Sequence, residues 1–577
     1  MRRQSRAAAS MQSSRRVRGG AGSRTRIRGA VAVAAVVLLL TGCNAIPGSG
    51  PVQAGLENLE QAEQQVQFNP GGPAAGSSQE DVVRGFVLAA VSSEDDFAVA
   101  REFLTPDYAE QWSPDSDVLI DDGGRPFQQN DDGSGTLSVS ATAKLDADGF
   151  MLPIEPGEST DLRFELQQVG GEWRISSAPN GIILDATTFT TLWSQHQLYF
   201  VGPAGTLVPE TRWFLTRAAL PTEIVGALLA GPGERLAEVV HSGFPAGTKL
   251  ASNSVPVVDG RARVDLTGTV LEATPEALAE IRQQLRLSLQ TVQNVNGVDL
   301  SAEGTAVRFD AADDASEPQP VNDMWDASAL VGSEFGSFVS GEFEVAEGFA
   351  ATLSDYDPSA ITVNPSGDAV AILSPAGISR IDAAGVVAVD ERRGLLPPMF
   401  DRFGYVWSLQ VSQPQTMLAT PKESSSVQVP APWLEGRKAV AVRLSPDGSR
   451  IAVLVADEHG SQVLVAGVVR DNSGRPESVT TEADVQLWAS GDPVDLDWVG
   501  QNRFAVLTKT DSTSRVTLGG VGLLPIDLGS VEGGVHLAGG SARTQLRVLG
   551  AGRELYASQA NGWQRAATDV RVLAKRG

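Results

Sequence analysis

A repeated pattern of tight turns and apolar strands over residues 346–577 restricts the fold more than any other feature of this chain. Pro-Ser-Gly-Asp at 365–368 precedes the strand phrase 369–373, and Ser-Pro-Asp-Gly at 445–448 precedes 451–454. Proline at the second position of such a turn favours a tight connection into a strand. The phrases recur about every 40–50 residues, the length of a propeller blade. They predict a β-propeller of about five or six blades, with a pair of β-sandwiches as the alternative.

The only cysteine of the 577 residues is Cys43, which ends the phrase Leu40-Thr41-Gly42-Cys43. This phrase resembles a lipobox, in which the sulfur takes a diacylglyceryl group and cleavage leaves the cysteine as the first residue. Residues 1–29 carry nine arginines and no acid, and an apolar run follows at 30–40. These segments are typical of a signal peptide, and the run is too short for a permanent transmembrane helix. Residues 1–42 are therefore predicted to be a lipoprotein signal peptide.

The resulting prediction is a palmitate-type lipid anchor on Cys43 that holds the protein at the extracytoplasmic face of the cell membrane. The alternative is a buried structural cysteine, but the Gly- and Pro-rich sequence 44–51 does not suit a core element. The pair Arg15-Arg16 lacks the hydrophobic residues of a twin-arginine signal, which favours the general secretory route. Met11 is an alternative start.

The net charge of −25 becomes −34 without the nine leader arginines, because 36 basic and 70 acidic residues remain. Such a surface repels nucleic acids, so nucleic-acid binding is not expected. The acidic composition is typical of a soluble protein or of one that binds cationic partners. The codon bias of a high-GC organism explains it equally well. A single cysteine permits no intramolecular disulfide, so the domains depend on their cores.

Two domains are expected between a flexible linker at 43–76 and the propeller. In 77–185, Ser78 and Asp81 indicate a capping box, helical periodicity follows, and a strand is expected over 137–145. A hairpin is expected around the pair Gly170-Gly171. This α+β order resembles the NTF2-like cone fold.

The second domain is expected at 195–312. One helix begins near Pro221 and stops at Gly231-Pro232, and another begins at Thr274-Pro275. A strand follows the turn at 259–260. Phrases at 228–232, 245–248 and 260–266 resemble the GerMN domain, a small α/β module. An acidic, irregular linker is expected at 313–345.

No motif for catalysis or metal binding emerges from the sequence. The histidines at 196, 241, 459 and 536 are far apart, and neither a phosphate-binding loop nor a nucleophile elbow is present. The acidic turns at 131–133 and 146–149 lack the further ligands that calcium needs, and solvated turns explain them better. A carboxylate pair across a cleft is the remaining enzyme possibility. No cofactor, catalytic residue or small-molecule substrate is predicted. Most tryptophans are expected in the core.

The order of lipobox, NTF2-like domain, GerMN domain and propeller, with the phrases at 83–86, 100–104, 396–401 and 404–408, resembles the actinobacterial lipoprotein LpqB family. The resemblance spans nearly the whole mature chain. It implies an accessory regulator that contacts the extracellular domain of an MtrB-like sensor histidine kinase, in two-component signalling for envelope homeostasis and division. Only Cys43 carries over as a family site residue. The alternative is a lipoprotein that binds peptidoglycan or another envelope ligand without kinase contact.

Overall fold

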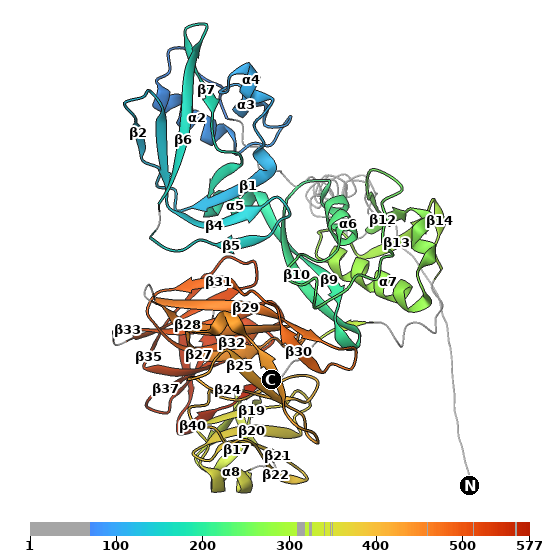
Figure 1. The fold of residues 1–577 in the computed structure, drawn as a ribbon, viewed down its shortest axis with the longest axis vertical. Helices are drawn as coiled ribbons and strands as arrows, with labels where there is room; N and C mark the ends of the chain where they lie inside the picture. The colour runs from blue at the N-terminus through green and yellow to red at the C-terminus, as the bar shows by residue number, and fades with distance from the viewer. Residues whose placement is uncertain are drawn as a thin grey trace, which may run out of the picture. The chain divides into compact units, whose positions relative to one another are not determined.

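The computed structural model describes residues 70–577, except 158, 309–317, 322–325, 340, 347, 349, 458–459, 512 and 560–561. The predicted signal peptide and lipobox lie outside the described residues, as does almost all of the expected linker at 43–76. The described chain forms an α+β domain, a smaller α/β domain and a C-terminal β-propeller, so the predicted fold class is confirmed (Figure 1). No helix of the described part is long and apolar enough to cross a membrane.

The α+β domain packs short helices against two four-stranded sheets, ordered β5-β4-β1-β8 and β2-β3-β6-β7. Helix α2 is capped by Ser78, whose hydroxyl accepts from the Asp81 N–H at 3.2 Å while the Asp81 carboxylate accepts from the Ser78 N–H at 3.2 Å, as the capping box predicts. Its buried face joins the sheets in one apolar core with Trp112. The elements are α2 (Gln79–Ala89), α3 (Ala98–Arg101), α4 (Pro106–Ala109), β1 (Asp117–Asp121), β2 (Phe127–Gln129), β3 (Gly135–Val139), β4 (Ala141–Asp146), β5 (Met151–Pro153), β6 (Thr160–Val169), β7 (Glu172–Ser177), β8 (Ile182–Asp185) and α5 (Ala186–Leu192).

The single strand expected over 137–145 is wrong, because the chain leaves one sheet at Ser140 and enters the other. Strand β3 pairs with β2 and β6, whereas β4 pairs with β1 and β5. The alternation of buried residues continues through the break, from Val139 to Ala141. Sequence periodicity reports which side chains face the core, and both strands face the same core. It therefore could not reveal the change of sheet.

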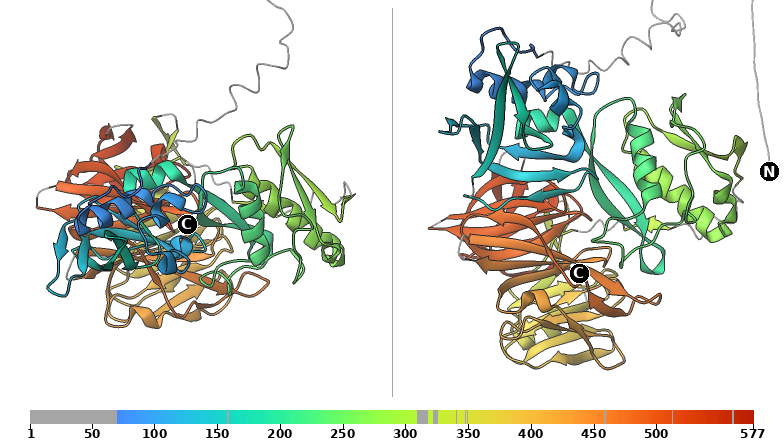
Figure 2. Two further views of the ribbon diagram at one scale, coloured as in Figure 1. Left: turned by 90° about the horizontal axis from the view of Figure 1, so that it is seen from above. Right: turned by 45° about the horizontal axis from the view of Figure 1, so that its top comes forward.

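The α/β domain joins a long hairpin to a small sheet ordered β11-β12-β13-β14. Both predicted helices are confirmed, and α7 is capped by the Thr274 hydroxyl, which accepts from the Ala277 N–H at 3.2 Å. Figure 2 shows α7 against the sheet beside α6. The elements are β9 (Trp193–Val201), β10 (Thr206–Leu215), α6 (Leu220–Ala230), β11 (Val257–Val258), β12 (Arg261–Leu266), α7 (Pro275–Leu289), β13 (Gly297–Ala302) and β14 (Thr305–Ala306).

Six sheets of four or five strands form the propeller, within the expected range of five or six blades. Their strands are β16 (Ser328–Val331), β17 (Glu334–Val339), β18 (Glu342–Val345), β19 (Ala360–Val363), β20 (Ala369–Ser374), β21 (Gly377–Asp382), β22 (Gly385–Asp390), β23 (Met399–Phe400), β24 (Val406–Leu409), β25 (Thr416–Thr420), β26 (Val427–Pro430), β27 (Lys438–Leu444), β28 (Arg450–Asp457), β29 (Gly460–Arg470), β30 (Pro476–Val479), β31 (Asp484–Ala489), β32 (Asp492–Val499), β33 (Arg503–Thr510), β34 (Thr513–Gly520), β35 (Ile526–Glu532), β36 (Gly534–Ala538), β37 (Arg547–Gly550), β38 (Leu555–Gln559), β39 (Gly562–Ala567), β40 (Val570–Leu573) and β41 (Lys575–Arg576). Helix α8 (Ala350–Tyr356) lies between β18 and β19.

The turns that carry the sequence repeat share one geometry. The N–H of Gly448 donates to the Ser445 carbonyl at 2.8 Å, and the N–H of Gly404 donates to the Asp401 carbonyl at 3.1 Å. Both glycines have a φ of +72° or more, a backbone that side chains disfavour. The predicted turn-then-strand phrases are therefore β-hairpin turns between neighbouring strands of a blade.

Part of the expected acidic linker at 313–345 instead belongs to the propeller. Residues 328–345 form β16, β17 and β18, and the late strand β40 pairs with β16 to complete this blade. This blade therefore combines strands from both ends of the propeller sequence. Its strands are short and the turn phrase of the other blades is absent from 328–345, so the sequence shows no repeat signal here.

Candidate functional site

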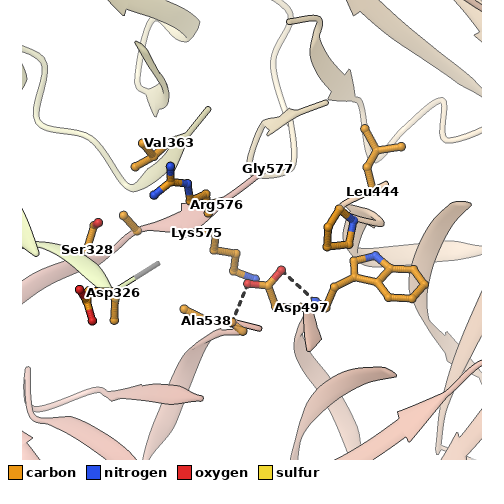
Figure 3. Close-up of a pocket in the computed structure, with 15 residues that line it drawn as sticks. Asp326, Ser328, Val363, Leu444, Asp497, Ala538, Lys575, Arg576 and Gly577 are labelled. Atoms are coloured by element: carbon orange, nitrogen blue, oxygen red, sulfur yellow. Dashed lines mark hydrogen bonds between the residues drawn. The ribbon is translucent and has the colours of Figure 1, made fainter. Parts of the chain in front are cut away.

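The axial cluster is made of four buried side chains of the propeller: Arg443 on β27, Asp495 and Asp497 on β32, and Lys575 on β41. Figure 3 labels Asp497 and Lys575 beside the adjoining cavity. The Lys575 ammonium donates to Asp495 Oδ1 at 2.5 Å and to the Leu496 carbonyl at 2.8 Å. The other oxygen of Asp495 accepts from the Leu537 N–H at 2.8 Å. Lys575 therefore links the last described strand to the inner strand β32, which strengthens ring closure.

The second acid of the axial cluster is held in the same way. Asp497 Oδ2 accepts from the Gly539 N–H at 2.8 Å, and Asp497 Oδ1 lies 3.5 Å from Arg443 Nε. The Arg443 guanidinium also donates to the Pro398 carbonyl at 3.1 Å. The two acids and two bases thus balance one another in charge, and they also bind backbone groups of two further blades, those of β23 and β36.

Neighbouring positive charges favour the ionised form of Asp495, and the space beside the cluster is too small for a substrate. Burial opposes ionisation of Asp495, yet Lys575 and His536 together hold its pKa below the usual range. Burial lowers the pKa of Lys575, against the attraction of Asp495. The adjoining cavity has a volume of about 20 Å³, enough for about one water molecule. We conclude that the axial cluster has a structural role, in which it joins strands of different blades.

The hairpin β9–β10 is the element that contacts all of the modules. The Arg450 guanidinium on the propeller donates to the Pro209 carbonyl of β10 at 2.6 Å. The indole N–H of Trp213 donates to the Gly522 carbonyl at 2.8 Å. Nearby, Arg235 of the α/β domain pairs with Asp484 of β31. These contacts join the α/β domain to the propeller, through one buried hydrogen bond at Arg450, one partly buried bond at Trp213 and one exposed ion pair at Arg235.

The same hairpin also meets the α+β domain at one of the acidic turns. The backbone N–H of Trp213 donates to the Gly149 carbonyl at 2.9 Å, and a Cβ on Gly149 would lie 2.6 Å from the Trp213 carbonyl oxygen. Strand β5, just after this turn, lies beside β31 of the propeller. The turn at 146–149 therefore serves packing between modules.

The aspartates of both acidic turns accept hydrogen bonds from N–H groups of their own turns, although Gly149 in the turn at 146–149 also packs against β10. Asp146 Oδ1 accepts from the N–H groups of Asp148 and Phe150 at 3.0 and 2.8 Å. Asp132 Oδ1 accepts from the Ser134 N–H at 3.0 Å, and its carboxylate pairs with Arg163. The carboxylates are thus used by their own turns, and the described residues contain no group of three or more potential metal ligands.

Two histidines of the α/β domain, His196 and His241, have polar partners that the sequence did not predict. His196 lies 2.9 Å from the hydroxyls of Ser194 and Thr291, and burial lowers its pKa to about 4. A neutral histidine beside a serine suggests a nucleophile and its base, but a hydroxyl occupies the place of the orienting carboxylate. His241 instead lies 3.3 Å from Glu280, which raises its pKa. His459 lies outside the described residues.

The lipobox residues Leu40, Thr41, Gly42 and Cys43 are not described by the structure, so their role stays a prediction. The tryptophans expected in the core are buried at 112, 193, 213, 407 and 498, and Trp173 is half-buried. Sequence reasoning missed the hairpin contacts and the axial cluster. The available signal was a charge inside an apolar strand, such as Arg443 within Ala-Val-Ala-Val-Arg-Leu at 439–444.

Comparison with known families gives three matches in chain order. Residues 72–190 match the N-terminal domain of lipoprotein LpqB, residues 197–308 match a sporulation and spore germination domain, and residues 337–573 match the lipoprotein LpqB beta-propeller domain. The first GerMN domain of the sporulation protein GerM from Bacillus subtilis has 19% identity and a TM-score of 0.18, over 22% of this chain and 95% of that one.

Two relatives match over most of both chains. Lipoprotein LpqB of Thermobifida fusca is 25% identical over 84% of this chain and 88% of its own length. Lipoprotein LpqB of Streptomyces coelicolor is 26% identical over 90% of this chain and 92% of its own length. The matches thus cover the α+β domain, the hairpin and the propeller together.

Proposed function

Because the chain belongs to the lipoprotein LpqB family, we propose that it is a lipid-anchored envelope protein that binds the extracytoplasmic domain of a sensor histidine kinase. In this role it regulates two-component signalling for envelope homeostasis and division. The observation that carries the proposal is the shared order of all three modules over most of the chain. The modules match lipoprotein relatives whose names denote no enzyme.

The structure supports a binding role through the way the modules are joined. Hydrogen bonds from Arg450 to Pro209 and from Trp213 to Gly522 join the domains at the hairpin β9–β10. A partner that contacts two modules at once would therefore bind surfaces that these hydrogen bonds join. A lipid on Cys43 would confine this scaffold to the membrane that holds the kinase, which raises the effective concentration of each partner for the other.

Binding is tested with soluble residues 44–577 and the extracytoplasmic domain of the cognate sensor kinase. We expect saturable binding at two salt concentrations, weaker at the higher one if the acidic surface contributes. The extracytoplasmic domain of an unrelated kinase is the matched control. Absence of binding by protein with an intact cooperative melting transition would overturn the proposal.

Anchoring is tested by Cys43→Ser in the full-length chain. The variant loses the thiol that accepts the lipid, so we expect it to leave the membrane fraction, while the unaltered chain stays there after a high-salt wash. A detergent phase-partition assay measures the lipid directly. Equal membrane retention of both chains would contradict a lipid anchor at Cys43.

A further inference from the structure

A cavity of about 260 Å³ lies between the hairpin β9–β10 and the loops at one end of the propeller. Gln197 and Tyr199 line it from β9, and Gln501, Asn502 and Ser541 line it from two propeller loops. All ten lining residues are uncharged, in a chain whose net charge is −25. The cavity therefore presents no charged side chain to a ligand.

The amide groups of this cavity are fixed by hydrogen bonds through their nitrogen atoms. The Asn502 amide donates to the buried Thr211 hydroxyl at 3.2 Å, and the Gln197 amide donates to the same oxygen at 3.3 Å. The Gln501 amide donates to the Val321 carbonyl at 2.5 Å. Because the nitrogens are held, the side chains are positioned before a ligand arrives, which lowers the entropic cost of binding.

Several polar atoms of the cavity remain available for a ligand. Within the described residues, the carbonyl oxygens of Gln501 and Asn502 and the hydroxyl of Tyr199 form no hydrogen bond to protein. Burial raises the pKa of Tyr199, so its hydroxyl is a neutral donor at physiological pH. The cavity thus offers two acceptors and one donor.

The chemistry of the lining selects among ligand classes. An anion or a cation would lose its hydration without gaining an opposite charge, and a purely apolar ligand would leave the amides unpaired. Pro209, Pro446 and the Tyr199 ring add apolar surface between the polar groups. A neutral ring with hydroxyl and amide groups satisfies both kinds of surface. The volume is close to the lower end of ligand pockets, about 300 Å³, which suits a single ring.

We propose that this cavity binds a neutral N-acetylated sugar residue. The carbonyl oxygens of Gln501 and Asn502 accept from the sugar's acetamido N–H and hydroxyl groups, and the Tyr199 hydroxyl donates to a sugar oxygen. Because the lining comes from both the hairpin and the propeller, the bound sugar holds the two modules together. Binding requires no kinase, so this site and the proposed regulatory function are tested separately.

The test uses residues 44–577 without any kinase domain, with N-acetylglucosamine and tri-N-acetylchitotriose as probes in calorimetry. Glucose, which lacks the acetamido group, and glucosamine, which is cationic, are the matched ligands. We expect saturable binding of both acetylated probes and weaker binding of the two control sugars. Binding of the trimer alone would place the site on a longer glycan and overturn the single-residue assignment.

Variants then locate the binding. Tyr199→Phe removes one hydroxyl and Gln501→Met removes one amide, and each is expected to weaken N-acetylglucosamine binding by about fivefold to tenfold. Gln128→Met, in an exposed position on β2, is the matched control and should leave binding unchanged. Melting transitions show whether the variants are folded. If Gln501→Met is unfolded, the conservative variant Tyr199→Phe alone tests the site. Absence of binding by the folded parent, or equal binding by all variants, would overturn the proposal.

Discussion

Buried charge is concentrated in the propeller, whereas the α+β and α/β domains bury mainly apolar and neutral polar groups. Among the described residues, nine charged side chains are buried in the propeller and three in the two preceding domains. Two of those three, Glu210 and Arg212, lie on the hairpin that contacts the propeller. The difference follows from architecture, because a ring of radial sheets buries many turns whose backbone N–H groups need acceptors.

Asp401 shows how a buried carboxylate serves such a turn. Its side chain accepts from the N–H groups of Phe403 and Tyr405 and from the Trp407 indole, at 2.8 to 3.0 Å. It also pairs with Arg470 at 2.8 Å, and both side chains are fully buried. The phrases at 396–401 and 404–408 thus contain Asp401 of this turn and its indole donor Trp407, whereas the ion partner Arg470 lies outside them.

The largest expected effect comes from Asp401→Ala. The substitution leaves the Arg470 guanidinium buried without its carboxylate and removes three hydrogen bonds, so we expect a loss of about 3–5 kcal/mol in stability. Urea denaturation followed by circular dichroism measures it. If Asp401→Ala lowers the free energy of unfolding by less than about 1 kcal/mol, the buried charges of the propeller do not stabilise it more than exposed pairs would.

The matched control for Asp401 is Asp527→Ala in the same propeller. Asp527 pairs with Arg515 at 3.1 Å, but both side chains are about half exposed. Asp527 also accepts from the Gly529 N–H at 2.9 Å in an exposed turn. Solvent screens the ion pair and replaces this hydrogen bond, so we expect a change within about 0.5 kcal/mol. The two variants together separate burial from ion pairing.

The next effect concerns His196, a buried titratable group of the α/β domain. Burial lowers its pKa from 6.5 to about 4, so the unfolded chain binds a proton more readily than the folded chain between these values. The stability contribution is complete above pH 6.5 and is lost as the pH falls through about 4. A shift of this size corresponds to about 3 kcal/mol. Denaturation between pH 7 and 4 should therefore depend less on pH in His196→Gln.

His241 is the internal control for this pH dependence. Glu280 raises its pKa, so its contribution is present below pH 6.5 and disappears as the pH rises through the raised value. His241→Gln should therefore change the profile in the opposite sense. If both variants flatten the same acidic limb, the assignment of that limb to His196 is wrong.

The sequence predicted features that depend on local periodicity and turn chemistry, such as the Ser78 capping box, the helix begun by Thr274 and the glycine turns of the blades. Prediction from the sequence failed where pairing between distant strands determines the structure. Residues 328–345 became strands because β40 pairs with β16, and the strand over 137–145 was divided between two sheets. The lining of the cavity was equally unpredictable, since Tyr199 and Gln501 meet only through the docking of the hairpin.

The smallest effect is expected from Thr274→Ala, which tests a domain held by its apolar core. The Thr274 hydroxyl caps α7, and its loss should cost about 1 kcal/mol, the usual value for a helix N-cap. The matched control is Thr190→Ala in α5, where the hydroxyl only bonds back to carbonyls of its own helix, and a change within about 0.5 kcal/mol is expected.

Helix α7 also holds β9, because the Gln284 amide donates to the Tyr199 carbonyl at 2.8 Å. If Thr274→Ala lowered the free energy of unfolding as much as Asp401→Ala does, the α/β domain and the propeller would unfold as one cooperative unit, coupled through the hairpin.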